Sequence, residues 1–170
     1  MTTPKKTMNV IYISLGSNIK PRLSNLKLAF NFIEKKIGVI SKYSKIYETP
    51  AWGFVSTSFL NTCILVITSL NTKETLQELQ KIEIKLGRKA KKSETYEARP
   101  IDLDIIYSSE GIFHTEKLKV PHPLMAERKF VLVPLKDIAK DLKHPLLHLT
   151  TDKLLEICKD DSLVEVFEDF

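Results

Sequence analysis

The stretch RPIDLDIIY, residues 99–107, combines an apolar strand pattern with two closely spaced aspartates. Side chains alternate between the two faces of a strand, so Asp102 and Asp104 share one face and the intervening Leu103 lies on the other. Two carboxylates this close repel each other and lose hydration beside apolar neighbours. The pattern therefore predicts a strand with one buried apolar face, and an opposite face where the acidic pair is either solvated or binds a cation.

The chain has 170 residues, 43% of them hydrophobic and 28% charged, as expected for an ordinary globular protein. Its two cysteines, Cys63 and Cys158, lie far apart without metal-ligand spacing, which indicates free thiols in a reducing compartment. No apolar run reaches the roughly 20 residues that span a bilayer. We therefore expect a single domain over residues 1–170, monomeric, cytoplasmic and without a membrane partner.

The net charge of +5 is compatible with nucleic acid or with small anions as partners. Five of the positive charges fall in the short segment KLGRKAKK, residues 85–92. One local basic cluster favours an anion site over a nucleic-acid-binding stripe, so no nucleic-acid partner is expected.

Patterns of apolar residues on either side of the opening stretch predict further strands and helices. Asn71 followed by Glu74 is a helix-capping signal, and Gly38 is suited to end the preceding helix. The predicted elements are a strand at 10–17, a helix at 21–37, a strand at 39–50, a strand at 59–70, a helix at 72–86 and the strand at 99–107.

This β-α-β-β-α-β order predicts an α+β fold with a ferredoxin-like core. In that arrangement both helices pack on one face of an antiparallel sheet, which leaves the other face free to build a site. After residue 108 the pattern is less regular, and we expect C-terminal additions that include a short helix at 150–158.

The aspartate pair is accompanied by many fixed positive charges. Mg²⁺ typically takes one or two protein carboxylates, with phosphate oxygens and water completing its shell. The nearby cations match the charge of a polyphosphate, and they are Arg88, Lys89, Lys91, Lys92 and Arg99. The glycine-rich loop that cradles phosphates in many nucleotide-binding proteins is absent from the sequence, so a nucleotide would be held differently.

Six sequence blocks, in order and spacing, resemble the 6-hydroxymethyl-7,8-dihydropterin pyrophosphokinase family of folate biosynthesis. They are YISLGSN (12–18), YETPAWG (47–53), FLN (59–61), IEIKLGR (82–88), RPIDLDII (99–106) and VPHPLMAERKFVLVPL (120–135). The resemblance implies the ferredoxin-like fold and in-line transfer of diphosphate from ATP to the pterin hydroxymethyl group, with AMP leaving.

The resemblance also implies three groups of site residues. The pterin-binding positions are Gly16, Thr49, Trp52, Gly53, Phe59, Asn61 and Phe130. The ATP-binding positions are Glu83, Arg88, Lys92, Arg99, Ile105, His122 and Arg128. The catalytic positions are Arg88, Arg99, Asp102 and Asp104, and the two aspartates are also the implied ligands of two Mg²⁺ ions that bind with ATP.

Single residues of this set have ordinary structural interpretations. Phe59 and Phe130 suit a protein core, Glu83 suits a solvated helix face, and His122 between two prolines suits a turn. The chain also departs from the family pattern at Ala90 and Tyr96, where many members carry arginine and tryptophan. Which of the lysines at 89, 91 and 92 supplies the missing charge stays open.

Two other functions compete with pyrophosphate transfer. One is a nucleic-acid-binding module that uses sheet-face aromatics and the basic loop, although its face would then carry two repelling aspartates. The other is a different Mg²⁺-dependent nucleotidyl or phosphoryl transferase.

Overall fold

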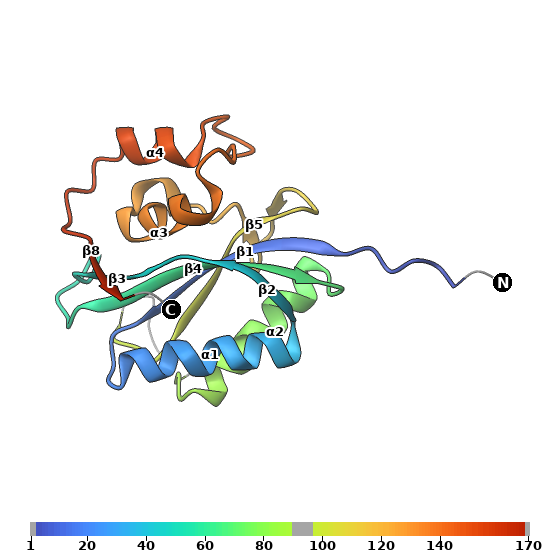
Figure 1. The fold of residues 1–170 in the computed structure, drawn as a ribbon, viewed down its shortest axis with the longest axis horizontal. Coiled ribbons are helices and arrows are strands. Elements are labelled where there is room, and N and C mark those ends of the chain that lie inside the picture. Colours follow the sequence, from blue (N-terminus) through green and yellow to red (C-terminus); the bar gives the residue numbers. More distant parts are fainter. Residues whose placement is uncertain (1–2, 90–96, 169–170) are drawn as a thin grey trace.

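The computed structural model describes residues 3–89 and 97–168 as an α+β fold built on an antiparallel sheet, as predicted (Figure 1). Lys91, Lys92, Ala90 and Tyr96 lie outside the described residues. The elements in chain order are β1 (Asn9–Ser17), α1 (Arg22–Lys36), β2 (Gly38–Tyr43), β3 (Ile46–Thr49), β4 (Phe59–Thr68), α2 (Thr72–Lys85), β5 (Asp102–Ser108), β6 (Phe113–His114), β7 (Lys119–Val120), a 3₁₀ turn (Met125–Glu127), α3 (Lys129–Ala139), α4 (Thr151–Ile157) and β8 (Glu165–Glu168).

The main sheet has the strand order β5-β1-β4-β3-β8, and β2 also pairs with β4. The single strand predicted at 39–50 is therefore wrong, because the structure divides it into β2 and β3. Ser44 separates them: its hydroxyl, not a backbone carbonyl, accepts the N–H of Cys63 on β4 at 2.9 Å. A side-chain acceptor interrupts the backbone ladder, and each half then pairs with β4 separately.

Helices α1 and α2 pack together on one face of the sheet (Figure 1). The apolar side chains of β5 face them, as the alternation predicted: Leu103 and Ile105 join the core cluster with Leu26 of α1 and Leu79 of α2. The predicted capping box at the start of α2 is also confirmed, because Asn71 and Glu74 bond each other's backbone N–H groups. This face therefore anchors β5 from behind and turns its aspartates to the opposite side.

The opposite face is covered in part by α3 and α4, which are not part of the predicted β-α-β-β-α-β core (Figure 1). Val131, Leu132 and Leu135 of α3 pack on Cys63 and Ile106 of the sheet. The helix contains Pro134, which removes one backbone donor and made a helix hard to predict here. Burial of its apolar stripe, about 1.5–3 kcal/mol for each large side chain, outweighs that loss.

Two further features lie in the C-terminal part of the chain. The short helix predicted at 150–158 is confirmed as α4. Strand β8, which the sequence pattern did not predict, pairs antiparallel with β3 and extends the sheet at that edge.

Both cysteines are free thiols, as predicted. Among the described residues, none of the helices combines the length and apolar character needed to cross a membrane.

Candidate active site

Two adjoining pockets lie at the end of the sheet where β1 ends and where β4 and β5 begin. The first is largely aromatic, and it is lined by Ser14, Gly16, Thr49, Pro50, Trp52, Phe54, Phe59, Asn61, Arg99, Asp102, Asp104, Arg128 and Phe130. The second is a charged cleft, and it is lined by Leu76, Gln80, Glu83, Ile84, Arg88, Lys89, Arg99, Asp102, Leu103, Asp104, His122, Pro123, Leu124 and Arg128. The two pockets share Arg99, Asp102, Asp104 and Arg128, so the acidic pair stands where they meet.

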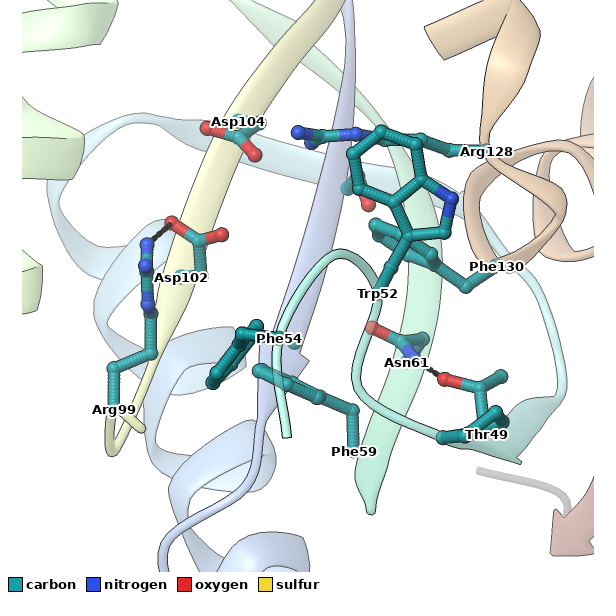
Figure 2. A pocket seen from close by; sticks show the side chains of 13 residues that line it. Thr49, Trp52, Phe54, Phe59, Asn61, Arg99, Asp102, Asp104, Arg128 and Phe130 are labelled. Carbon is teal, nitrogen blue, oxygen red and sulfur yellow. Dashed lines mark hydrogen bonds and ion pairs between the residues drawn. The ribbon is translucent and has the colours of Figure 1, made fainter. Parts of the chain in front are cut away.

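The polar edge of the aromatic pocket is built around Asn61, whose side chain is almost fully buried. Its Nδ2 donates to Thr49 Oγ1 at 2.7 Å (Figure 2). Gly16 leaves the space that its Oδ1 occupies, because a Cβ on Gly16 would stand only 2.8 Å from that oxygen. A buried amide held in one orientation can recognise a polar ring edge specifically.

Aromatic side chains surround this amide. Phe54 and Phe59 meet edge to face with ring centroids 6.2 Å apart, and Trp52 and Phe130 lie on the side towards Arg128 (Figure 2). Gly53 does not line the pocket, but its φ of 80° allows the turn that places Trp52 and Phe54. The pocket can therefore hold a flat heteroaromatic ring whose polar edge meets Asn61.

The aspartates project from β5 on the same side, as the alternation predicted (Figure 2). Asp102 Oδ1 lies 3.1 Å from Arg88 Nη1 and 3.3 Å from Arg99 Nη1. Burial raises the pKa of Asp104 above its ordinary value, and the charges of Asp102 and Glu83 raise it further. This strained acidic pair would be relieved by a cation.

The donor set suits Mg²⁺ bound together with a ligand. Within residues 3–89 and 97–168 no group of three or more His, Cys, Asp or Glu side chains has the arrangement of a metal site. Two carboxylates alone leave most of an octahedral shell to other oxygens, and Mg²⁺ commonly completes that shell with phosphates and water. The residues present therefore fit Mg²⁺ carried by a polyphosphate.

Glu83 is buried, so its interpretation as a solvated carboxylate is wrong. Its Oε1 accepts from the backbone N–H of Leu103 at 2.8 Å and lies 2.7 Å from Arg88 Nη1. Arg88 thus joins Glu83 on α2 to Asp102 on β5. Burial raises the pKa of Glu83 to about 7, against the opposing effect of the Arg88 charge.

This raised pKa predicts a pH-dependent stability. Between pH 4.5 and 7 the folded protein keeps a proton on Glu83 that the unfolded chain releases, so stability falls as pH rises through that interval. We expect Glu83→Gln to match wild type near pH 5 and to exceed its free energy of unfolding by roughly 2 to 3 kcal/mol near pH 8. Denaturant titrations at both pH values measure the difference. Glu34→Gln, on the exposed side of α1, is the control, and parallel pH profiles for Glu83→Gln and wild type would contradict the prediction.

His122 provides a neutral donor at the charged cleft. Burial and the nearby Arg128 charge lower the pKa of His122 to about 4, so the imidazole is uncharged near pH 7. Its Nδ1 accepts from the backbone N–H of Leu124 at 3.2 Å, which places the ring proton on Nε2. A neutral N–H donor can bond a phosphate oxygen at little desolvation cost.

Arg128 connects the two pockets. Its guanidinium carbon lies 4.8 Å from the centroid of the Trp52 ring and 5.5 Å from that of Phe130. The positive charge of Arg128 opposes the rise in the pKa of Asp104 and helps to lower the pKa of His122. A guanidinium stacked on aromatic rings is held in place for contacts with phosphate.

The structure brings most of the predicted site residues to these pockets, and the exceptions are Gly53, Ile105 and Lys92. The Ile105 side chain packs in the core behind β5 and lines neither pocket, because it falls on the opposite face from the aspartates. Any contact of Ile105 with a nucleotide is therefore left to its backbone. Lys92 lies outside the described residues.

Sequence reasoning missed Ser14 and Phe54 as pocket residues. Ser14 lies opposite Asp104 on β5 and opposite Cys63 on β4. Ser14 stands two residues before Gly16 on β1, so the two lie on the same face of the strand. This spacing could have identified Ser14 as a pocket residue. For Phe54 no such signal existed, because a loop has no periodicity from which to infer orientation.

Asn18, in the YISLGSN block, was also missed. Its backbone N–H donates to the Arg99 carbonyl at 3.2 Å, and its Oδ1 accepts from the Arg99 N–H at 2.7 Å. Its Nδ2 donates to Ser56 Oγ at 3.0 Å and to the Thr57 carbonyl at 3.2 Å. Asn18 therefore joins the start of β5 to the loop that carries Trp52 and Phe54.

Comparison with known proteins identifies the family of the chain. A sequence model described as 7,8-dihydro-6-hydroxymethylpterin-pyrophosphokinase (HPPK) matches residues 12–140. The 2-amino-4-hydroxy-6-hydroxymethyldihydropteridine pyrophosphokinase of Aquifex aeolicus is 36% identical over 140 residues, which cover 82% of this chain and 86% of that protein. Folic acid synthesis protein FOL1 of Dictyostelium discoideum is 37% identical over 148 residues, covering 86% of this chain but only 22% of the relative.

Solved structures agree at the level of the fold. A crystal structure of a Plasmodium falciparum HPPK-DHPS triple mutant with STZ-DHP superposes with a TM-score of 0.75 at 17% identity. The match covers 91% of this chain and 44% of the Plasmodium chain. The resemblance expected from the six sequence blocks is thus confirmed, and the chain belongs to the 7,8-dihydro-6-hydroxymethylpterin-pyrophosphokinase family.

Proposed function

We propose that the protein transfers diphosphate from ATP to the hydroxymethyl group of 6-hydroxymethyl-7,8-dihydropterin, giving AMP and the pterin diphosphate in folate biosynthesis. The observation that carries this proposal is the aspartate pair at the junction of an aromatic pocket and a charged cleft. Such an arrangement suits a reaction between a flat ring with a reactive substituent and a polyphosphate. The name of the Aquifex relative, a hydroxymethyldihydropteridine pyrophosphokinase, supports the same substrate.

We assign the aromatic pocket to the pterin. Asn61, oriented by Thr49, reads the polar edge of the ring, and Gly16 provides the close approach beside it. Phe59 and Phe130 contact the two ring faces, while Trp52 and Gly53 supply the loop over the pocket. The hydroxymethyl group then points towards the aspartate pair.

We assign the charged cleft to ATP. Arg88, Arg99 and Arg128 line it and offer paired N–H donors for phosphate oxygens, and neutral His122 adds a further donor. Glu83 orients Arg88 through their ion pair, and Lys92 is proposed as a helper in the basic loop. Because these groups hold the triphosphate from several sides, the β-phosphorus is presented to the pterin hydroxyl for in-line attack.

Asp102 and Asp104 would hold two Mg²⁺ ions that bind with ATP. When bound, Mg²⁺ neutralises phosphate charge and makes the attacking alcohol a better nucleophile. The two carboxylates lie two residues apart on β5, so they would hold the ions where the aromatic pocket meets the charged cleft. No covalent enzyme intermediate is part of this proposal.

The broader organisation follows from the same proposal. Residues 1–170 form a single pyrophosphokinase domain with a ferredoxin-like core, made by β1-α1-β2/β3-β4-α2-β5, and with C-terminal additions. The protein acts as a monomer in the cytoplasm, where its thiols stay reduced, on ATP and the pterin without nucleic-acid or membrane partners.

A product analysis tests the proposed function. Purified protein is incubated with Mg²⁺, ATP and 6-hydroxymethyl-7,8-dihydropterin, and the products are separated and identified. AMP and pterin diphosphate in equal amounts support the proposal. ADP would indicate an ordinary kinase, and the absence of Mg²⁺-dependent turnover would indicate a binding module.

The space beside Gly16 makes a further prediction for the pterin pocket. In Gly16→Ala the new methyl group would stand only 2.8 Å from Asn61 Oδ1, displacing the amide that we propose reads the ring edge. We expect KM for the pterin to rise by about tenfold, while KM for ATP stays within about twofold. Initial rates with each substrate varied in turn measure both constants. Equal increases in the two constants would contradict a local effect on the pterin pocket.

A further inference from the structure

The loop at residues 50–58 carries Trp52 and Phe54 into the aromatic pocket, but its own ends are fixed from outside that pocket. It begins directly after Thr49, which orients Asn61, and it ends directly before Phe59. Any movement of these two ends would therefore displace both the amide and the aromatic wall. The contacts that hold these two ends therefore determine whether the pocket has its binding shape before a ligand arrives.

Arg22, the first residue of α1, contacts both ends at once. Its Nη1 lies 2.6 Å from Glu48 Oε2 and donates to the backbone carbonyl of Ser58 at 3.0 Å. Glu48 immediately precedes Thr49, and Ser58 immediately precedes Phe59. The side chains of Arg22 and Glu48 are 19% and 38% exposed, so the ion pair is only partly shielded from water, and the bond to Ser58 makes it a two-point contact.

Strand β8 supports the same arginine from the far edge of the sheet. It pairs with β3, placing Glu165 opposite Glu48 and Val166 opposite Tyr47. The guanidinium carbon of Arg22 lies 5.9 Å from the centroid of the Phe167 ring, within the range of a cation–π contact. β8 lies outside the residues matched by the family model and lines neither pocket of the candidate site.

We propose that Arg22 is a positioning residue for the pterin half of the site, and that β8 assists it through Phe167. Thr49 already pairs with Phe59 across β3 and β4. The guanidinium of Arg22 adds a side-chain tie between Glu48 and Ser58 beside that pairing, and so restrains the two ends of loop 50–58 further. The identity of the ligand rests on the proposed function. The tie itself rests only on the contacts of Arg22.

The proposal predicts a selective loss of pterin affinity. Arg22→Ala removes both contacts, and we expect the dissociation constant of the pterin to rise by about tenfold. Arg22→Lys retains the charge but cannot reproduce the planar fork, so an intermediate rise is expected. Phe167→Ala should raise the constant by about threefold, and Phe167→Tyr should restore it.

Calorimetric titration of the full chain measures these affinities. The pterin is titrated with a non-hydrolysable ATP analogue and Mg²⁺ present, and the analogue is titrated alone. The analogue should bind every variant within about twofold of wild type, because its cleft contains no contact with Arg22. Lys35→Ala, at the exposed C-terminal end of α1, is the matched control for loss of a basic side chain from this helix.

Amide hydrogen exchange gives a second readout that needs no ligand. In Arg22→Ala the amides of loop 50–58 should exchange about tenfold faster than in wild type, while those of β1 and α2 keep their rates. Unchanged pterin affinity, equal losses for pterin and nucleotide, or unchanged loop exchange would each overturn the positioning role. If wild type itself binds no pterin, the proposed function fails, and loop exchange in Arg22→Ala still decides whether Arg22 holds the loop.

Discussion

Asp104→Asn is expected to lower turnover by about a thousandfold while the protein keeps its fold. Asp104 lines both pockets, so a substitution there affects the point where the two pockets meet. Asparagine has almost the same shape but lacks the charge that would hold Mg²⁺ against the phosphates. Asp102→Asn should behave in the same way, with an added effect on the orientation of Arg88 and Arg99.

The same substitution separates function from stability. Removing one of two close carboxylates relieves repulsion, and burial already raises the pKa of Asp104. In the absence of Mg²⁺ the variant should therefore be at least as stable as wild type at pH 8. Steady-state rates, circular dichroism and denaturant titration together measure this outcome, with Asp141→Asn at an exposed position as control. Turnover close to wild type in either aspartate variant would remove the basis of the proposed Mg²⁺ site.

Asn61→Ala is expected to lower kcat/KM for the pterin by about a hundredfold. The amide is buried, and its Nδ2 is committed to Thr49, so its carbonyl is held in one orientation next to Gly16. Truncation would remove the group that we propose reads the ring edge, and it would also remove the Asn61 donor from the Thr49 hydroxyl. A site built to bond a polar edge discriminates strongly, because an unpaired buried group costs more than an ordinary hydrogen bond contributes.

The kinetic pattern distinguishes recognition from general damage. The loss should appear with the pterin as varied substrate, while the affinity for a non-hydrolysable ATP analogue stays within about twofold of wild type. Asn31→Ala, on the exposed side of α1, is the matched control for an asparagine truncation. A loss of similar size in nucleotide affinity would show that Asn61 acts on the fold and not on pterin recognition.

Local patterns predicted those parts of the fold that local physics determines. The alternation in β5 placed the aspartates opposite Leu103 correctly, because a strand that packs on helices must bury one face. The capping pair Asn71 and Glu74 likewise marked the start of α2 within a few residues, since its hydrogen bonds are made inside the helix end.

The errors arose where distant contacts decide the structure. Ser44 divides the strand predicted at 39–50 only because its hydroxyl meets the N–H of Cys63 on β4. Helix α3 tolerates Pro134 because the sheet buries its apolar stripe. Strand β8 forms by pairing with the edge of β3. Its four residues are too few for a periodic pattern to identify a strand in the sequence.

The predictions for the site differ in the same way, because local patterns identified some residues and tertiary contacts determine the others. Charge and spacing identified Asp102, Asp104 and the nearby arginines 88 and 99, and only the family resemblance identified Arg128. Burial of Glu83, by contrast, depends on its bonds to Leu103 and Arg88 across α2 and β5. Phe54 reaches the pocket through the conformation of a loop. Charge pattern predicts the chemistry of a site, but the walls around it are set by tertiary packing.

The position of Asn18 has a consequence for how the two pockets would influence each other. Asn18 bonds the backbone of Arg99 on one side and bonds Ser56 and Thr57 on the other. In addition, the Thr57 hydroxyl donates to the backbone carbonyl of Asn18 at 2.7 Å. If Arg99 binds phosphate as proposed, its backbone bonds with Asn18 would connect that event to the loop over the aromatic pocket. By thermodynamic reciprocity, any factor by which nucleotide binding raised pterin affinity would equal the factor by which pterin binding raised nucleotide affinity. Asn18 lies on the hydrogen-bonded path through which such a coupling would run.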